Sequence, residues 1–428
     1  MTVCSVASAQ DEDPPGTFKI PGLRTKLTLS GYAQLDITYD LGGRNPLVEG
    51  DDYAILSSRI PLNLGYDSRN KTNQLYMTAR TSRVGISTNT ETEWADIGTR
   101  IEGDFWSGNL LSGETFTNSV LFRLRHGYGT LSGKYGSLLL GQTWTTFLIQ
   151  EGTAEVVDFN GPGSGAALRQ PMIRYVIPLP SSFDLSLAAE NAPGTDLNGI
   201  TDGTAVPATR KMQSIPDFVG RLSTSGAWGG ASLVAVTVNY KDSGAPGQDS
   251  YTKQGWGLGA GTGVKIFDDT LRLMVNGGRG IGRYLFAAGG VQGVTNMDTH
   301  FLLWDALGYH VNYTHVWSPE FRSNVVWSQT FFKNNGGSTA AAPYEPRIDS
   351  KTGLLIEPEP NRAIEEMYIN TFWAPNRQVE FGIEYAFGQR HTFGNDAAEG
   401  QPCTVGMLCS SMVGTMHRIT TTAHFNLF

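Results

Sequence analysis

Residues 27–40 read LTLSGYAQLDITYD, and they alternate between a mainly apolar and a mainly polar series of side chains. A repeat of two is typical of a β-strand, because successive side chains point to opposite faces. A strand needs about 9–11 residues to cross a membrane, so this stretch is long enough to do so. The apolar series is Leu27, Leu29, Gly31, Ala33, Leu35, Ile37 and Tyr39, and the polar series is Thr28, Ser30, Tyr32, Gln34, Asp36 and Thr38.

The same alternation recurs along the chain, for example where Val379, Phe381 and Ile383 interleave with Glu380 and Glu384. A soluble antiparallel sheet also alternates, but the length and the repetition of the pattern favour a barrel. An even number of strands is expected for a bacterial barrel. We place about sixteen strands, at 27–40, 75–89, 93–106, 119–131, 136–144, 171–179, 182–191, 217–226, 230–241, 252–267, 270–279, 301–317, 320–333, 364–374, 377–390 and 415–428.

Short connections alternate with long polar ones. Outer-membrane barrels have short periplasmic turns and longer external loops, so this asymmetry predicts an all-β, transmembrane antiparallel barrel of about 16 strands over residues 26–428. The short connections are 132–136, 225–230, 268–269, 318–320 and 374–377, and the long ones are about 41–73, 143–170, 192–215, 279–300, 334–362 and 391–414. Aromatic residues that suit the membrane interface flank several short turns, at Trp228, Phe267, Trp317, Phe321 and Trp373.

The composition agrees with a barrel that has a wet interior and a lipid-facing exterior. Charged residues make up 17 % of the 428 residues, whereas soluble domains carry about 25 %. Glycine is frequent, with 52 residues, and aromatic residues reach 11 %. No stretch of 18 or more apolar residues predicts a transmembrane helix. The formal charge of −8 argues against a nucleic-acid partner.

The residues before the predicted barrel fall into two parts. Ala7, Ser8 and Ala9 fit the small-residue pattern that precedes a signal-peptide cleavage site. We therefore interpret residues 1–9 as the remaining end of a signal peptide, with an arbitrary flexible terminus as the alternative. Residues 10–25 are expected to form a short periplasmic segment.

Two cysteines lie in the last long polar stretch. Cys403 and Cys409 are separated by five residues and could form a disulfide in an oxidising compartment. Two free thiols are the alternative. We expect no metal site, because neither a further cysteine nor a spaced histidine pair accompanies them.

Several segments in the first half of the chain resemble a known family. They are LTLSGYAQLDITYD at 27–40, TRIEGDFW at 99–106, LFRLRHGYG at 121–129, LGQTWTTF at 140–147 and RQPMIRY at 169–175. Together they resemble the DcaP-like family of outer-membrane porins from Gram-negative bacteria, most strongly over residues 26–192. The resemblance implies a sixteen-stranded trimeric porin whose third loop folds inward. It also implies a preference for anionic solutes such as dicarboxylates.

Arginines occupy polar positions of the early predicted strands. Each would cost roughly 2–4 kcal/mol if it faced lipid near the midplane, so we expect them to line the pore. Strands adjacent in sequence are neighbours in the barrel, so these arginines share one wall with Glu102 and Asp104. Ion pairs that brace the wall are the alternative role. The predicted pore-lining arginines are Arg83, Arg100, Arg123, Arg125 and Arg174 on strands, and Arg59 and Arg169 in adjoining loops.

The connection at about 143–170 is predicted to narrow the pore. It contains Glu151, Glu155 and Asp158, followed by a glycine-rich bend at 161–165. If the bend lets the loop fold inward, its carboxylates face the arginines and set a transverse field. Guanidinium groups bind carboxylates bidentately, and a row of weak sites favours anion entry without trapping. A mobile external loop is the alternative.

The predicted function is passive diffusion of small hydrophilic solutes across the Gram-negative outer membrane, with a preference for anions. A general, weakly selective porin is the closest alternative. A barrel-form outer-membrane enzyme and a secreted β-rich carbohydrate-binding protein are alternatives of another class. We expect no enzyme activity and no cofactor, because the sequence has neither a nucleophile elbow nor a zinc-protease motif. The expected partners are outer-membrane lipid, lipopolysaccharide and small anionic solutes, with a homotrimer implied by the resemblance.

Overall fold

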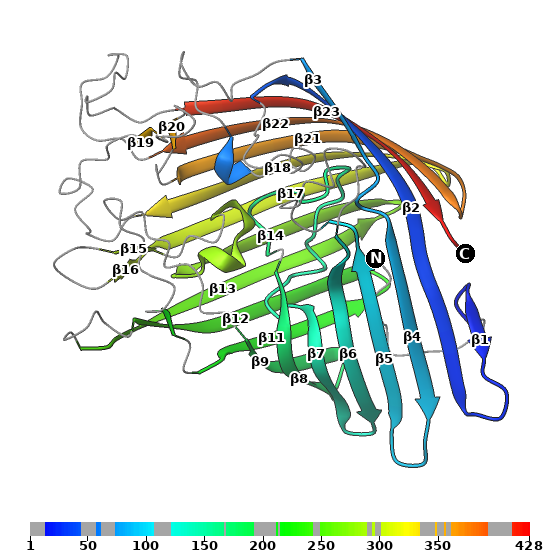
Figure 1. Ribbon diagram of the computed structural model, residues 1–428. Helices are drawn as coiled ribbons and strands as arrows, with labels where there is room; N and C mark the ends of the chain where they lie inside the picture. Colours follow the sequence, from blue (N-terminus) through cyan, green and yellow to red (C-terminus); the bar gives the residue numbers. More distant parts are fainter. Residues whose placement is uncertain are drawn as a thin grey trace.

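The alternating strands form a closed antiparallel barrel in the computed structural model (Figure 1). The structure describes residues 13–43, 57–60, 73–106, 121–166, 168–191, 211–212, 215–242, 249–288, 293–295, 301–333, 347–348, 355–356, 361–392 and 413–428. Each wall strand pairs with the next along the chain, and β2 closes the barrel by pairing with β23. The predicted fold class is confirmed.

Sixteen strands make the wall when β3 and β4 are taken as one interrupted strand, because both pair with β2. The wall strands are β2 (Thr25–Gly42), β3 (Gln74–Thr78), β4 (Arg83–Glu91), β5 (Asp96–Asp104), β6 (Arg123–Gly133), β7 (Gly136–Trp144), β8 (Arg169–Leu179), β9 (Phe183–Glu190), β11 (Asp217–Gly226), β12 (Gly229–Asp242), β13 (Tyr251–Ile266), β14 (Asp269–Arg279), β17 (Asp305–Ser318), β18 (Phe321–Lys333), β21 (Asn361–Asn376), β22 (Val379–Thr392) and β23 (Val413–Asn426).

The remaining elements are short. They are β1 (Thr17–Lys19), β10 (Lys211–Met212), β15 (Gly293–Thr295), β16 (Phe301–Leu303), β19 (Arg347–Ile348), β20 (Leu355–Ile356) and the 3-10 turns η1 (Ser57–Arg59), η3 (Gly282–Tyr284) and η4 (Phe286–Ala288). β1 forms an antiparallel hairpin with the start of β2. Within the described ranges, no helix is both long and apolar enough to span a membrane.

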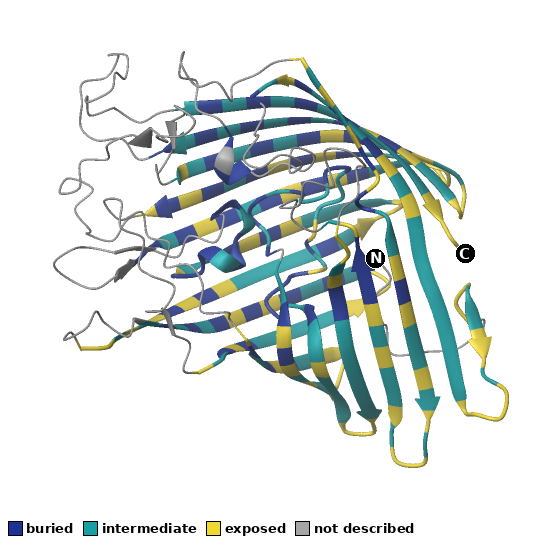
Figure 2. Cartoon of the chain, viewed as in Figure 1, coloured by how far each residue is buried: buried dark blue, intermediate teal, exposed yellow. Residues whose placement is uncertain are grey.

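The polarity of the wall is inverted relative to a soluble protein. Along β17, His310 and Asn312 face inward and are at most 2 % exposed. Leu307 and Tyr313 face outward and are more than 40 % exposed. Figure 2 shows the same alternation of buried and exposed positions along most wall strands. A polar interior and an apolar exterior are the arrangement of a transmembrane barrel.

Most predicted strands agree with the structure, and the two at 136–144 and 217–226 agree residue for residue. The predicted strand 75–89 is wrong in one respect, because it is interrupted between Thr78 and Arg83. There Thr81 Oγ1 donates to Asp36 at 2.7 Å and Ser82 Oγ accepts the Gln34 amide at 3.0 Å. These side-chain bonds replace the strand ladder. The predicted strand 301–317 is likewise divided, into β16 and β17.

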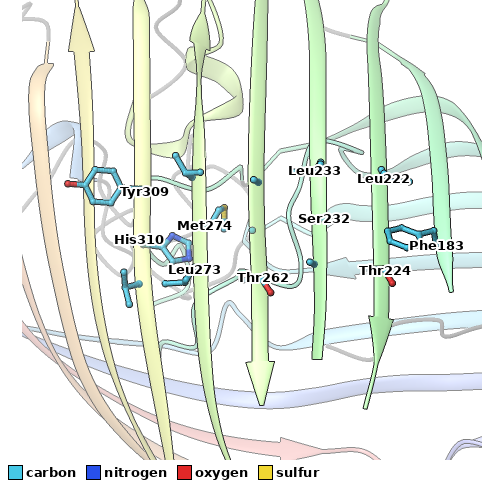
Figure 3. A pocket seen from close by; sticks show the side chains of 15 residues that line it. Phe183, Leu222, Thr224, Ser232, Leu233, Thr262, Leu273, Met274, Tyr309 and His310 are labelled. Carbon is cyan, nitrogen blue, oxygen red and sulfur yellow. The ribbon is translucent and has the colours of Figure 1, made fainter. Parts of the chain in front are cut away.

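The outer face carries features that suit a bilayer. Trp228, Phe267 and Trp317 are 46 %, 98 % and 64 % exposed beside short turns, where an aromatic girdle is expected. A groove of about 560 Å³ on the wall is lined mainly by apolar side chains, among them Leu222, Leu233 and Leu273 (Figure 3). The predicted signal-peptide end at 1–9 and the pair Cys403 and Cys409 lie outside the described residues.

Candidate functional site: the inner loop and the arginine cluster

The connection between β7 and β8 folds into the barrel, and we call residues 145–168 the inner loop. At its start, the Thr146 amide donates to Glu190 of β9 at 2.7 Å. Near its middle, the Val157 amide donates to Glu384 of β22 at 2.8 Å. These two strands lie on opposite sides of the barrel in the order of the sheet, so the inner loop crosses the lumen.

Four inward-facing glycines of β13 form the surface on which the inner loop lies. A Cβ at Gly261 would be 2.5 Å from Ile149 Cγ2, and a Cβ at Gly263 would be 2.5 Å from the Glu151 carbonyl oxygen. A Cβ at Gly257 would be 3.4 Å from Phe147 Cζ. Glycine in a strand often marks a site of close backbone approach. The glycine series therefore makes room for the loop within the lumen.

Three buried carboxylates on inward-facing positions hold the inner loop through hydrogen bonds. Glu190, Glu366 and Glu384 are each at most 1 % exposed. Glu190 accepts Thr145 Oγ1 and the Thr146 amide, both at 2.7 Å. Glu366 accepts the Gly163 amide at 2.7 Å, and Glu384 accepts the Val157 and Asp158 amides at 2.8 and 2.9 Å. Charge-assisted bonds of this kind are about twice as strong as neutral ones.

The predicted loop acids lie in the inner loop, but they do not face the early arginines. Glu151 pairs with Arg221 of β11 at 2.5 Å, and Glu155 pairs with Arg322 of β18 at 2.7 Å. Asp158 Oδ1 accepts the amides of Asn160 and Gly161, which folds the loop on itself. For Glu151 and Glu155, the expected position opposite the arginine wall is therefore wrong, because these two acids attach the loop to β11 and β18 instead.

The early arginines meet on β4, β5 and β6. Asp104 binds Arg123 and Arg125 at 2.8 and 2.7 Å. Glu102 binds Arg100 at 2.6 Å, with Arg125 at 3.2 Å and Arg83 at 3.5 Å. Arg125 is 2 % exposed, whereas the Arg100 and Arg123 side chains are 38 % and 29 % exposed. The wall is thus braced by ion pairs and still presents guanidinium groups to the lumen.

Local backbone geometry brings an additional residue to this wall. The register between β5 and β6 shifts at Glu102, which leaves Glu102 opposite His126. Such a β-bulge lets both Arg125 and His126 approach the same carboxylate. His126 Nε2 lies 3.8 Å from Glu102, and its Nδ1 lies 2.9 Å from Thr143 Oγ1. The alternation of the sequence alone would place only one of the two neighbours inside.

Two further arginines that were predicted to line the pore, Arg169 and Arg174, differ in role. Arg169 is the first residue of β8, and its guanidinium lies 4.4 Å from the centre of the Trp144 ring. The Arg125 guanidinium lies 5.8 Å from the same ring, and Arg169 has no ion-pair partner among the described residues. Arg174 instead donates to the Trp144 carbonyl at 2.5 Å and to Thr146 at 2.8 Å, at the base of the inner loop. The side chain of Arg59 lies outside the described residues.

We define the arginine cluster as Arg83, Arg100, Arg123, Arg125 and Arg169 together with Glu102 and Asp104. Five arginines against two carboxylates leave three positive charges. The inner loop reaches this cluster through Phe159, whose ring centre is 5.9 and 5.8 Å from the guanidiniums of Arg123 and Arg125. Phe159 also stacks on Trp106 with 4.8 Å between ring centres. Aromatic rings and guanidinium groups therefore lie together where the inner loop meets the wall.

The connection between β14 and β17 also packs against the inner loop and forms a hydrogen bond with it. The Ala287 amide of η4 donates to the Gly163 carbonyl at 2.8 Å, and a Cβ at Gly163 would be 2.5 Å from Ala287 Cβ. Tyr284 of η3 donates to Asp217 at 2.7 Å. Burial, together with the charges of Asp217 and Glu190, raises the pKa of Tyr284 well above its ordinary value. Its hydroxyl therefore stays protonated and keeps donating.

Sequence reasoning did not identify the residues that hold the inner loop. Arg221 and Arg322 lie 70 and 167 positions from their loop partners, so no local pattern reveals the pairing. Alternation places Glu384 in the polar series of its strand, and it would do the same for Glu366, but it does not link either residue to the loop. In the part of the chain that the structure describes, no group of three or more His, Cys, Asp or Glu side chains is arranged to hold a metal ion.

Comparison with known proteins identifies the family. A family model described as DcaP outer membrane protein matches residues 9–410, whereas none of the curated proteins compared matches the sequence. The crystal structure of the outer membrane channel DcaP of Acinetobacter baumannii superposes with a TM-score of 0.73, at 22% identity, over 96% of this chain and 99% of that one.

Two further solved outer-membrane proteins share the fold at lower identity. An anion-selective porin from Comamonas acidovorans has a TM-score of 0.54 and 12% identity, with 94% and 100% of the two chains covered. The trimer form of OmpT from Vibrio cholerae has a TM-score of 0.55 and 11% identity, with 94% and 99% covered. Since the family model spans nearly the whole sequence, the chain belongs to the DcaP outer membrane protein family and is a porin of the Gram-negative outer membrane.

Proposed function

We propose that this porin passes small anions, with dicarboxylates as the preferred class, by passive diffusion. The surplus of positive charge in the arginine cluster carries the proposal, because five guanidiniums share two carboxylates. A lumen with low-dielectric walls focuses such a field and raises the local concentration of counter-ions. Guanidinium groups also match the geometry of carboxylates.

The ion pairs within the cluster and its attraction for anions are compatible. Glu102 and Asp104 hold the guanidiniums in place, and they cancel only two of the five positive charges. Arg100 and Arg123 remain partly exposed, and Arg169 stacks on Trp144 without an acidic partner among the described residues. Several weak sites of this kind attract an anion without retaining it.

The first prediction concerns the sign of the selectivity. In planar bilayers under a KCl gradient, we expect the reversal potential to lie toward the chloride equilibrium potential. Arg169→Gln is expected to move it toward zero, because this change removes a cation without leaving an acid unpaired. Arg279→Gln is the matched control, since Arg279 pairs with Asp305 at the long-loop end of β14 and is 48% exposed.

A cation preference in the unmodified channel would contradict the proposal. A reversal potential near zero that Arg169→Gln leaves unchanged would instead support a general, weakly selective porin. Swelling of proteoliposomes then tests the solute class. We expect succinate to enter faster than erythritol, an uncharged molecule with the same number of carbon and oxygen atoms.

We further propose that three copies assemble in the membrane and contact lipid and lipopolysaccharide through their apolar outer faces. The OmpT neighbour has a trimer form, and this chain exposes large apolar side chains around the barrel. The second prediction is that the detergent-solubilised protein has the mass of three chains in light scattering. A monomer mass, after correction for bound detergent, would contradict it.

A further inference from the structure

Glu384 binds the tip of the inner loop by both of its carboxylate oxygens. Its Oε2 accepts the Val157 amide at 2.8 Å, and its Oε1 accepts the Asp158 amide at 2.9 Å. Asn370 Nδ2 also donates to Oε2 at 2.9 Å. The side chain is 1 % exposed and has no ion-pair partner among the described residues. The two consecutive loop amides are therefore its main donors.

The residue that follows these amides reaches the arginine cluster. Phe159 lies 5.8 Å from the Arg125 guanidinium and stacks on Trp106. Asp158 closes the turn around it by accepting the Asn160 and Gly161 amides at 3.0 and 3.1 Å. The tip thus joins β22 to the cluster, whose first strand, β4, is separated from β22 along the wall by β23 and β2.

We propose that Glu384 is a positioning residue that sets the aperture and the anion preference of the pore by holding Phe159 against the arginine cluster. This inference rests on the proposed function, since it assigns a determinant to the same passage. The other two carboxylates hold the loop farther from Phe159 along the chain, at Thr146 and Gly163. Glu384 holds the two residues directly before Phe159.

The chemistry of the clamp requires a carboxylate. Each oxygen faces an N–H donor, so an ionised glutamate satisfies both loop amides at once. A glutamine has the same shape, but its NH₂ group would face one of those amides. A buried donor without an acceptor costs about 1–3 kcal/mol. That cost is sufficient to favour conformations in which the tip leaves β22.

The test combines Glu384→Gln, Phe159→Ala and the double variant. We expect each single change to raise single-channel conductance roughly twofold, because the width of the pore depends on the Phe159 ring. Phe159→Ala deletes this ring, and Glu384→Gln releases it from the arginine cluster. We also expect each to move the reversal potential toward zero. The double variant should match Phe159→Ala alone, because Glu384 acts through Phe159.

Glu365→Gln is the matched control, since this glutamate of the adjacent strand β21 accepts Trp327 Nε1 in an exposed bond on the outer face. Heat-modifiable mobility checks that each barrel is folded. If Glu384→Gln fails this check, Glu384→Asp keeps the charge, withdraws both oxygens by one methylene, and is expected to shift both readouts in the same direction.

Two results would overturn the inference: a Glu384 variant that behaves as Glu365→Gln does, or effects that add in the double variant. A cation-preferring wild-type channel would reject the proposed function alone. The conductance comparison would still decide whether Glu384 acts through Phe159.

Discussion

Gly263→Leu is expected to push the start of the inner loop away from β13, lower the conductance and add current fluctuations. A Cβ at this position would lie 2.5 Å from the Glu151 carbonyl oxygen, whereas the nearest wall atom, Arg272 Cγ, is 3.7 Å away. The loop must therefore move, while the wall can stay in place. The displaced loop narrows the passage beside the arginine cluster.

The displacement also breaks specific contacts. Glu151 holds Arg221 at 2.5 Å and Ser232 at 2.7 Å, and both bonds depend on the loop lying flat on the glycines. Overpacking of this kind costs about 1–3 kcal/mol. The measurement is single-channel recording, together with protease sensitivity of the inner loop.

Gly129→Leu is the matched control for this substitution. A Cβ there would meet nothing nearer than the Gly98 carbonyl oxygen, at 3.7 Å. The control should conduct as the unmodified channel does. If Gly263→Leu also leaves conductance and fluctuations unchanged, the inner loop is not confined against β13 as the structure has it.

The sequence predicted the wall well because the membrane imposes one rule on every strand. Outward side chains must be apolar and inward ones can be polar, so alternation alone located strands such as β7 and β11. The rule fails where side-chain hydrogen bonds replace the backbone hydrogen bonds between two strands. Thr81 and Ser82 bond to β2 and interrupt the strand predicted at 75–89.

The candidate site was only partly predictable. The alternation of polar and apolar residues correctly predicted that Arg123 and Arg125 face the interior. The pairing of adjacent strands correctly predicted that they lie beside Glu102 and Asp104. The wall residues that bind the inner loop could not be predicted, because they lie far from the loop in the sequence and no local sequence pattern marks them. Nor does the sequence pattern indicate that Phe147, Ile149 and Glu151 occupy the space beside the glycines of β13.

Among the variants proposed here, Arg125→Met is expected to lower the free energy of unfolding most. It is also expected to weaken the anion preference. Arg125 is 2 % exposed and binds both Glu102 and Asp104, at 3.2 and 2.7 Å. Removal of one partner from a buried ion pair costs about 3–5 kcal/mol. The other arginines of the cluster still bind the two acids, so we expect the lower end of that range. Urea unfolding in detergent micelles measures the change.

The double variant Arg125→Met with Asp104→Asn separates two explanations of selectivity. Because Arg125 is almost inaccessible, its influence on a passing anion should act through the field rather than through contact. The surplus of three positive charges falls to two in Arg125→Met and returns to three in the double variant, since the cluster then loses one charge of each sign. The reversal potential should therefore recover in the double variant, and part of the stability with it. A reversal potential that stays as low as in Arg125→Met alone would mean that the Arg125 guanidinium itself binds the solute.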